Sequence, residues 1–200
     1  MSFLSVEKIS AGYGGHPILA DVSFQLEQGC MMGILGANGC GKTTLLKTIC
    51  GILPHKGTCL LEQTVLEQLS ARRMARLVGY IPQRSGISID ISVLDVVLMG
   101  FNPRLGLLER PGRKMQDLAA QALEQVGLGG REQSNYLCLS EGQKQLCILA
   151  RTLVSGSRLL LLDEPESALD FRYRHRMFNL LKAWVAQEKR AVVATLHDPS

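Results

Sequence analysis

Residues 33–48 read GILGANGCGKTTLLKT, and this glycine-rich stretch decides how the rest of the chain is interpreted. It satisfies the pattern G-x-x-x-x-G-K-[ST] of a phosphate-binding loop. The four fixed positions are Gly36, Gly41, Lys42 and Thr43. An apolar run over residues 30–35 precedes the loop like a buried strand, and a helix-compatible run over residues 42–50 follows it. The sequence therefore predicts a strand, a loop and a helix in the order that a nucleotide site requires.

The residue types of this loop predict its chemistry. Glycines let the backbone fold back so that several N–H groups point into one hollow, and the next helix adds free N–H groups and the positive end of its dipole. We expect Lys42 to reach the outer phosphates of a nucleotide and the Thr43 hydroxyl to hold Mg²⁺. A glycine-rich turn without a ligand is the alternative, but it leaves the match at every fixed position unexplained.

A second cluster ends another apolar run, where residues 159–165 read LLLLDEP. The four leucines predict a buried parallel strand. The carboxylate that ends this strand, Asp163, is suited to hold Mg²⁺ or its water, and Glu164 is placed to orient and deprotonate an attacking water. Taken alone, the run could equally be a buried strand before a solvated turn. The presence of the phosphate loop favours the nucleotide interpretation.

A third motif, LSEGQ at residues 139–143, is a helix start that carries a serine and a glycine. Such a start is a second place where an anion could rest. Most helix starts of this kind are plain N-caps, and by itself this one favours that simpler interpretation.

The composition bounds the class of protein. A chain of 200 residues suits one domain, or one core with an inserted subdomain, and 46% hydrophobic with 20% charged residues argues against disorder. No stretch of 18 uncharged apolar residues exists, and the first ten residues lack the pattern of a signal peptide. The net charge of +4 is dispersed except at residues 172–176, which we interpret as a solvated helix face rather than a nucleic-acid site.

Six cysteines occur, at positions 30, 40, 50, 59, 138 and 147. None forms C-x-x-C, and no histidine stands at a zinc-like spacing, so the sequence predicts reduced thiols rather than a metal cluster. Cys40 differs from the others because it lies inside the phosphate loop, where we expect bulky thiol reagents to block nucleotide binding.

Hydrophobic periodicity divides the chain into parts. Residues 1–30 read as strands, because Val22, Phe24 and Leu26 alternate with polar residues. From residue 84 to residue 154 the pattern is helical, and strands alternate with helices before and after this block. The sequence therefore predicts an α/β core with a helical insertion.

The motifs stand in the order of a known family. Over essentially its whole length the sequence resembles the nucleotide-binding subunit of an ATP-binding cassette (ABC) transporter. Residues 34–44 resemble its Walker A loop, residues 159–164 its Walker B strand, and residues 139–143 its signature LSGGQ. Gln83 stands in the place of its Q-loop, and His197 in the place of its switch histidine.

The resemblance implies an α/β P-loop NTPase fold. Its parts are a RecA-like mixed-sheet core, an N-terminal antiparallel β-subdomain and an inserted helical subdomain. The implied boundaries are residues 1–83 and 155–200 for the core with its β-subdomain, and residues 84–154 for the helical part. Residues 167–170 match the D-loop, and Tyr13 stands where the family places an aromatic ring against adenine.

The resemblance also implies ATP and Mg²⁺ as ligands. The residues implied to bind ATP are Tyr13, Gly36, Ala37, Asn38, Gly39, Cys40, Gly41, Lys42, Thr43, Thr44, Ser140, Gly142, Gln143 and Asp170. The implied catalytic residues are Glu164, His197 and Gln83, and the implied metal ligands are Thr43, Gln83 and Asp163.

The family mechanism pairs two subunits head to tail, so that each ATP lies between the Walker A loop of one and the signature of the other. Ser140 and the Gly142 backbone would then touch the γ-phosphate across the interface. Gln83 would sense Mg²⁺ or the attacking water, and His197 would contact the γ-phosphate. Asp170 would contact the opposite subunit.

Three substitutions and the chain end depart from the family pattern. Glu141 replaces the first signature glycine, and its carboxylate either weakens the sandwich or points into solvent. Cys40 replaces the more usual serine, and Glu166 a common threonine. None removes a group that performs chemistry, so we expect an active ATPase. Family members usually continue beyond the switch histidine, so the end at Ser200 implies either a truncated form or dispensable further elements, and we expect a truncated form to be less stable than an extended one.

Residues 69–73 and 94–106 resemble the importers of iron–siderophore, haem and vitamin B12. This implies a peripheral subunit on the cytoplasmic face of the membrane that powers import of a metal chelate. Its implied partners are transmembrane permease subunits and, indirectly, a substrate-binding protein, but no nucleic acid. A soluble ABC-type ATPase is one alternative, although the interval between Walker A and signature is too short for a coiled coil. A low-turnover regulator is another, although Glu164 is present.

Overall fold

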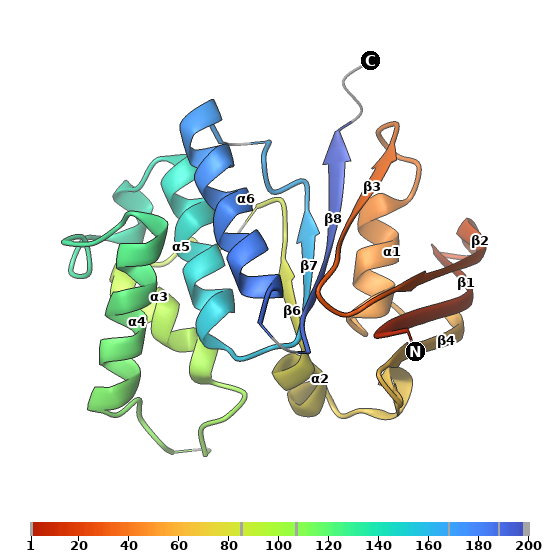
Figure 1. Cartoon of the computed structure of the whole chain (residues 1–200), viewed down its shortest axis with the longest axis horizontal. Coiled ribbons are helices and arrows are strands. Elements are labelled where there is room, and N and C mark those ends of the chain that lie inside the picture. Colours follow the sequence, from red (N-terminus) through yellow and green to blue (C-terminus); the bar gives the residue numbers. More distant parts are fainter. Residues whose placement is uncertain (1, 85, 107, 168, 188, 198–200) are drawn as a thin grey trace.

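The computed structural model describes residues 2–84, 86–106, 108–167, 169–187 and 189–197. Within these residues the strands form two four-stranded sheets, one antiparallel and one parallel, and Figure 1 shows helices on both sides of the parallel sheet. The predicted α/β fold class is confirmed. Parallel and antiparallel pairs are segregated between the two sheets of the described part of the chain.

The antiparallel sheet is built from the N-terminal strands in the order β2-β1-β4-β5. Their bounds are β1 (Leu4–Tyr13), β2 (His16–Leu26), β4 (Lys56–Leu61) and β5 (Thr64–Val65). The alternation predicted for β2 is confirmed, because Val22, Phe24 and Leu26 are at least half-buried, whereas Ser23 and Gln25 are exposed. This sheet therefore turns one face toward the interior.

The parallel sheet has the order β3-β8-β7-β6. Its strands are β3 (Met31–Gly36), β6 (Val78–Ile81), β7 (Leu159–Asp163) and β8 (Ala191–His197). Gly36 is in register with His197, and Asp163 with Thr195. The carboxyl ends of three neighbouring strands therefore meet at one edge, where open α/β sheets place their ligands.

The run of four leucines in β7 lies between two hydrophobic cores. Leu159 and Leu161 face the core shared with α1 and the antiparallel sheet, and Leu160 and Leu162 face the core shared with the helical block. All four side chains are fully buried. The predicted buried parallel strand is confirmed.

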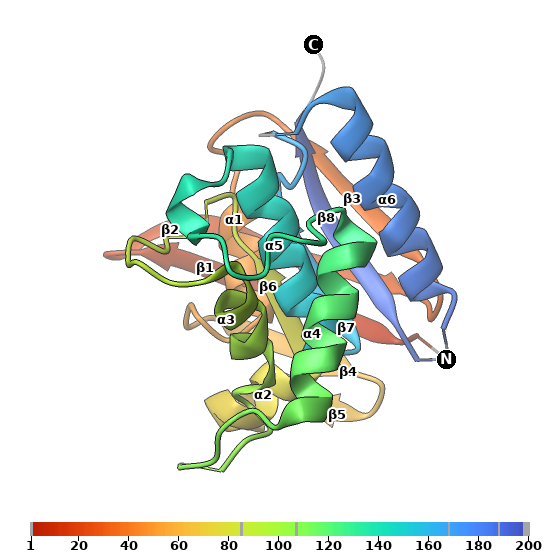
Figure 2. The ribbon, with the colours of Figure 1, turned by 90° about the vertical axis from the view of Figure 1, so that its left-hand side faces the viewer.

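The helices cover both faces of the parallel sheet. Their bounds are α1 (Lys42–Ile49), α2 (Ala71–Leu77), α3 (Val93–Leu98), α4 (Arg113–Val126), α5 (Glu141–Val154) and α6 (Phe171–Val185), with short 3₁₀ turns η1 (Leu66–Gln68), η2 (Met99–Phe101) and η3 (Tyr136–Cys138). Figures 1 and 2 place α3, α4 and α5 together as one block beside the sheet, and Figure 1 places α1 between the two sheets. The block comes from the chain between β6 and β7, as the helical insertion predicts.

Local signals set the helix boundaries. The Ser70 hydroxyl accepts a hydrogen bond from the Arg73 N–H at the start of α2, and the Ser92 hydroxyl accepts one from the Asp95 N–H at the start of α3. Gly127 ends α4 in a left-handed conformation with a φ of +81°.

Candidate nucleotide site

The phosphate loop connects the end of β3 to the start of α1, at the edge where the parallel strands end. Gly39 and Gly41 have φ values of +79° and +101°, a region that side-chain-bearing residues rarely adopt. At Gly41 a Cβ atom would also lie only 2.9 Å from Leu19. The N-cap of α1, Gly41, offers no side chain to its free N–H groups, and the first turn holds no acidic residue. These groups are therefore available to an anion.

Lys42 is folded back over the loop. Its ammonium group donates to the Gly36 carbonyl at 2.5 Å and to the Ala37 carbonyl at 3.2 Å, and it lies 3.6 Å from a carboxylate oxygen of Glu164. The side chain is only 6% exposed, so these contacts compensate the cost of burying its charge. The positive group is thereby held at the mouth of the loop.

A network of hydroxyl groups surrounds Asp163 at the end of β7. Thr43 and Thr195 each donate to one carboxylate oxygen at 3.0 Å, and the Tyr80 hydroxyl donates to the other at 3.3 Å. Asp163 is 3% exposed. Burial, followed by the charge of Asp163, raises the pKa of Tyr80, so Tyr80 remains a donor. A buried carboxylate beside a threonine hydroxyl is a set of hard oxygen ligands, which fits Mg²⁺.

Sequence reasoning missed Thr195 and Tyr80. Each is a hydroxyl residue inside a largely apolar strand, Thr195 in β8 and Tyr80 in β6. A polar side chain near the carboxyl end of a buried parallel strand is the signal that could have found them.

Glu164 follows β7 directly and lies between two polar partners. Gln83 donates from its amide nitrogen to one carboxylate oxygen at 2.8 Å, and Lys42 lies near the other. The Glu164 N–H donates to the Thr195 hydroxyl at 2.9 Å. Its φ of +47° is unusual for a residue other than glycine, and such conformations gather at functional sites. The fold therefore brings Lys42, Gln83 and Glu164 together.

A cavity of about 230 Å³ lies over this constellation and is lined by Gly39, Gly41, Thr44 and Glu164, together with Ile18, Lys42 and Thr43. Ile18 comes from β2 of the other sheet. The cavity combines free backbone N–H groups, one ammonium group and the carboxylate of Glu164. This combination is suited to a polyphosphate and a water molecule that attacks it.

The signature residues do not line this cavity. Ser140 and Gln143 form a reciprocal capping box at the start of α5, with the Ser140 hydroxyl accepting from the Gln143 N–H at 3.3 Å. Gly142 is buried in the first turn. The Glu141 carboxylate is 72% exposed and pairs with Lys144 at 2.8 Å, so it points into solvent. Within the described residues, the signature of the chain therefore lies away from the phosphate loop of the same chain.

The remaining predicted residues lie at separate places. Tyr13 ends β1 and is 45% exposed, and Asp170 is the N-cap of α6, accepting from the Tyr173 N–H at 2.9 Å. Asn38 is exposed in the loop. The backbone of His197 ends β8 beside Gly36, whereas its side chain lies outside the described structure. Ala168, within the predicted D-loop, also lies outside it.

The comparisons with known proteins agree with this geometry. Residues 19–167 match the family model described as ABC transporter. The chain belongs to the ABC transporter family. The hemin import ATP-binding protein HmuV of Bordetella pertussis is 37% identical over 204 residues, which cover 98% of this chain and 77% of that protein. The manganese transport system ATP-binding protein MntB of Bacillus subtilis is 34% identical over 198 residues, which cover 98% of this chain and 77% of that protein.

A solved ABC transporter supports the same assignment. A transporter described as metal-chelate type, in an inward-facing conformation, has 33% sequence identity and a TM-score of 0.83, and the match covers 99% of this chain and 74% of that chain. The predicted resemblance to the ABC ATP-binding subunits is confirmed. In the described part of this ABC chain, every helix falls short of the length or the apolar character needed to cross a bilayer.

Cys40 permits a chemical test of the loop. Cys40 is exposed, and its sulfur lies close to Gly36. A Cβ atom placed on Gly36 would be 2.7 Å from that sulfur. A maleimide adduct would fill the loop, so we expect labelling of Cys40 to abolish nucleotide binding and Mg-ATP to slow the labelling. Fluorescent-nucleotide binding after mass-spectrometric confirmation of the adduct measures this. Labelling the exposed Cys138 is the control; unchanged binding with Cys40 modified contradicts the prediction.

Proposed function

We propose that this chain binds Mg-ATP on its phosphate loop and hydrolyses it to power a membrane transporter. The observation that supports this most directly is the contact of Thr43 with Asp163 and of Lys42 and Gln83 with Glu164 at one sheet edge. It joins a phosphate-binding loop, a candidate metal ligand and a candidate base in one site.

The proposed mechanism assigns one task to each group. Lys42 leaves the carbonyls of Gly36 and Ala37 to contact the outer phosphates, and the α1 N–H groups bind the same anion. Thr43 and Asp163 would hold Mg²⁺, and the bound ion would supply charge neutralisation to the phosphates. Glu164 accepts the proton of the attacking water.

Further residues complete the proposed site. Gln83 keeps the carboxylate of Glu164 oriented through the bond at 2.8 Å. The remaining loop residues, the Tyr13 ring and the His197 side chain are proposed to contact the nucleotide.

Hydrolysis is proposed to need a second copy of the chain. The capping box of α5 presents Ser140, Gly142 and Gln143 away from the chain's own loop, and the start of this helix is suited to the γ-phosphate of a partner's ATP. Asp170 would touch the opposite subunit in this head-to-tail pair. We also propose that the chain divides into two parts. The core comprises residues 1–83 and 155–200, and the helical part comprises residues 84–154.

The proposed cargo is a metal chelate of the iron–siderophore, haem or vitamin B12 type. Similarity to a hemin import protein and to a metal-chelate type transporter supports it, whereas similarity to a manganese transport protein offers a competing cargo. The chain would act at the cytoplasmic face of the membrane, bound to permease subunits that receive cargo from a substrate-binding protein.

Reconstitution of the chain with its permease in liposomes tests this function. We expect ATP-dependent uptake of a ferric siderophore, haem or cobalamin and no uptake of free Mn²⁺. Uptake of Mn²⁺ alone would overturn the proposed cargo but leave the ATPase intact. A chain that hydrolyses no ATP with the permease present would overturn the function itself.

The carboxylate in the signature gives a further prediction. Replacing Glu141 with Gln removes a negative charge near the proposed γ-phosphate and leaves the positive charge of Lys144, its partner at 2.8 Å. We expect ATP-dependent pairing to strengthen about fivefold, which corresponds to about 1 kcal/mol. Sedimentation with ATP measures the pairing, and Glu124→Gln, on an exposed position of α4, is the control. Unchanged or weaker pairing would show that the carboxylate does not face the phosphate.

A further inference from the structure

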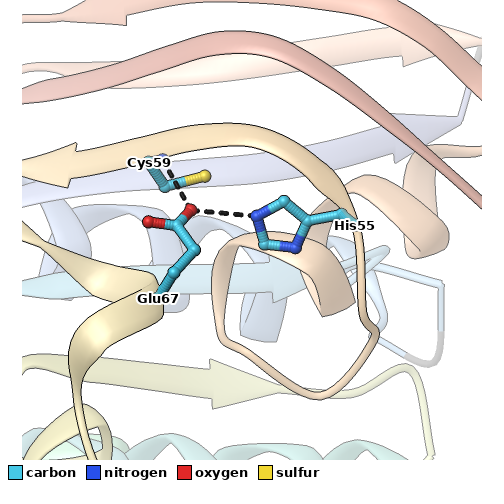
Figure 3. Close-up of side chains that lie close together, drawn as sticks. All are labelled: His55, Cys59 and Glu67. Carbon is cyan, nitrogen blue, oxygen red and sulfur yellow. Dashed lines mark hydrogen bonds and ion pairs between the residues drawn. The ribbon is translucent and has the colours of Figure 1, made fainter.

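Three metal-ligating side chains converge far from the nucleotide site. His55 follows the end of α1, Cys59 lies on β4, and Glu67 lies in η1. One ligand atom from each lies within 4.8 Å of those of the other two. Figure 3 shows the Cys59 sulfur, the His55 ring and the Glu67 carboxylate turned toward one another. The arrangement brings one nitrogen, one sulfur and one oxygen ligand to a single point.

The hydrogen bonds of His55 leave one ring nitrogen facing a carboxylate. Its Nδ1 lies 3.3 Å from the Leu53 carbonyl, to which it donates in one neutral tautomer. Its Nε2 then carries a lone pair and lies 2.9 Å from Oε1 of Glu67, which is also an acceptor. Either a proton on Nε2 or a metal cation between the two groups resolves this contact. A ring that donates to a backbone carbonyl and offers its other nitrogen outward is the usual arrangement of a metal-bound histidine.

The other two side chains are fixed in place. Oε1 of Glu67 accepts the backbone N–H of Cys59 at 2.7 Å, which ties η1 to β4. The Cys59 side chain is fully buried. Burial, together with the charge of Glu67, raises the pKa of its thiol to about 12, so the metal-free protein carries a protonated thiol there. A bound metal takes the place of that proton.

We propose that His55, Cys59 and Glu67 form a site for Zn²⁺. A thiolate, an imidazole and a carboxylate together suit this borderline-soft cation better than Mg²⁺ or Mn²⁺, which prefer oxygen ligands. Three protein ligands leave a fourth position for water. A cavity of about 680 Å³ lined by His55 and Glu67 gives that position an entry path.

This site is separate from the proposed ATPase site. The cavity lies at the end of α1 that carries Thr48 and Ile49, whereas the phosphate loop lies at the other end, near Lys42. Eight residues of helix span about 12 Å. Zinc binding therefore needs neither nucleotide nor turnover, and it can be tested without measuring hydrolysis.

Zinc competition against a chromophoric chelator tests the proposal in the whole chain. The exposed thiols are first removed by replacing Cys30, Cys40 and Cys138 with Ser, and excess Mg²⁺ blocks oxygen sites. We expect one equivalent of Zn²⁺ to bind in this background. Cys59→Ser and His55→Gln should each weaken the binding at least tenfold, and Cys147→Ala, a buried cysteine in α5, should leave it unchanged.

Cobalt substitution supplies an independent measurement. With Co²⁺ we expect a thiolate-to-cobalt charge-transfer absorption that Cys59→Ser removes and Cys147→Ala retains. If Cys59→Ser does not fold, as judged by cooperative thermal unfolding, His55→Gln and Glu67→Gln give the same test through zinc affinity. No equivalent of Zn²⁺ in the thiol-depleted background, or equal affinity in all variants, would overturn the site and leave His55 and Glu67 as an ion pair only.

Discussion

Replacing Glu164 with Gln is expected to lower ATP turnover at least about a hundredfold. The amide cannot accept a proton from the attacking water, although it has nearly the same shape. Its oxygen can still accept the hydrogen bond that Gln83 now donates to Glu164 at 2.8 Å. Nucleotide binding should therefore change far less than turnover, which separates a catalytic defect from a folding defect.

The measurement is steady-state phosphate release together with fluorescent-nucleotide binding. The matched control is Glu62→Gln, because Glu62 is also a carboxylate in an ion pair, with Arg158 at 2.6 Å, but it does not line the nucleotide cavity. If Glu164→Gln keeps wild-type turnover, Glu164 is not the base.

Replacing Lys42 with Met is expected to weaken nucleotide binding about 10- to 100-fold. A charge-assisted hydrogen bond contributes about 1.5–3 kcal/mol, and each 1.4 kcal/mol is a factor of ten in affinity. Methionine keeps the apolar stem of the buried side chain but removes the ammonium group that Gly36, Ala37 and Glu164 now surround.

Nucleotide-dependent thermal stabilisation measures this loss. Saturation at 100 times Kd stabilises a protein by about 2.7 kcal/mol, and the Lys42→Met variant should lose about 1.3–2.3 kcal/mol of that gain at the same ATP concentration. Lys47→Met, in the last turn of the same helix, is the control. An equal nucleotide-induced rise in Tm for both variants would mean that Lys42 does not bind the phosphates.

The site was predictable where its signals are local. Gly41, Lys42 and Thr43 belong to one loop, and a carboxylate after a buried strand is a signal of its own. The meeting of Thr43 with Asp163 agrees with the family resemblance, which implies both residues as ligands of Mg²⁺. Thr195 was missed, since its bond to Asp163 spans 32 positions and depends on the order of strands in the sheet.

The convergence of His55, Cys59 and Glu67 could not be predicted for a related reason. Spacing rules for zinc sites assume ligands on a tight turn or a helix. Here His55 directly precedes β4 and Cys59 lies within that strand, and the third ligand arrives after the β4–β5 turn, through η1. The left-handed backbone conformation of Glu164 could not be predicted from the sequence either, because glutamate has no preference for that conformation.

The two-sided burial of β7 has a consequence for how the chain unfolds. Leu160 and Leu162 belong to one core, and Leu159 and Leu161 to the other, so neither core is complete without this strand. The two hydrophobic cores are joined by a shared strand rather than by a linker, so unfolding of one core exposes apolar surface of the other. We therefore expect a single cooperative transition in calorimetry. The carboxylates at the end of that strand, Asp163 and Glu164, therefore lose their positions only when the whole chain unfolds.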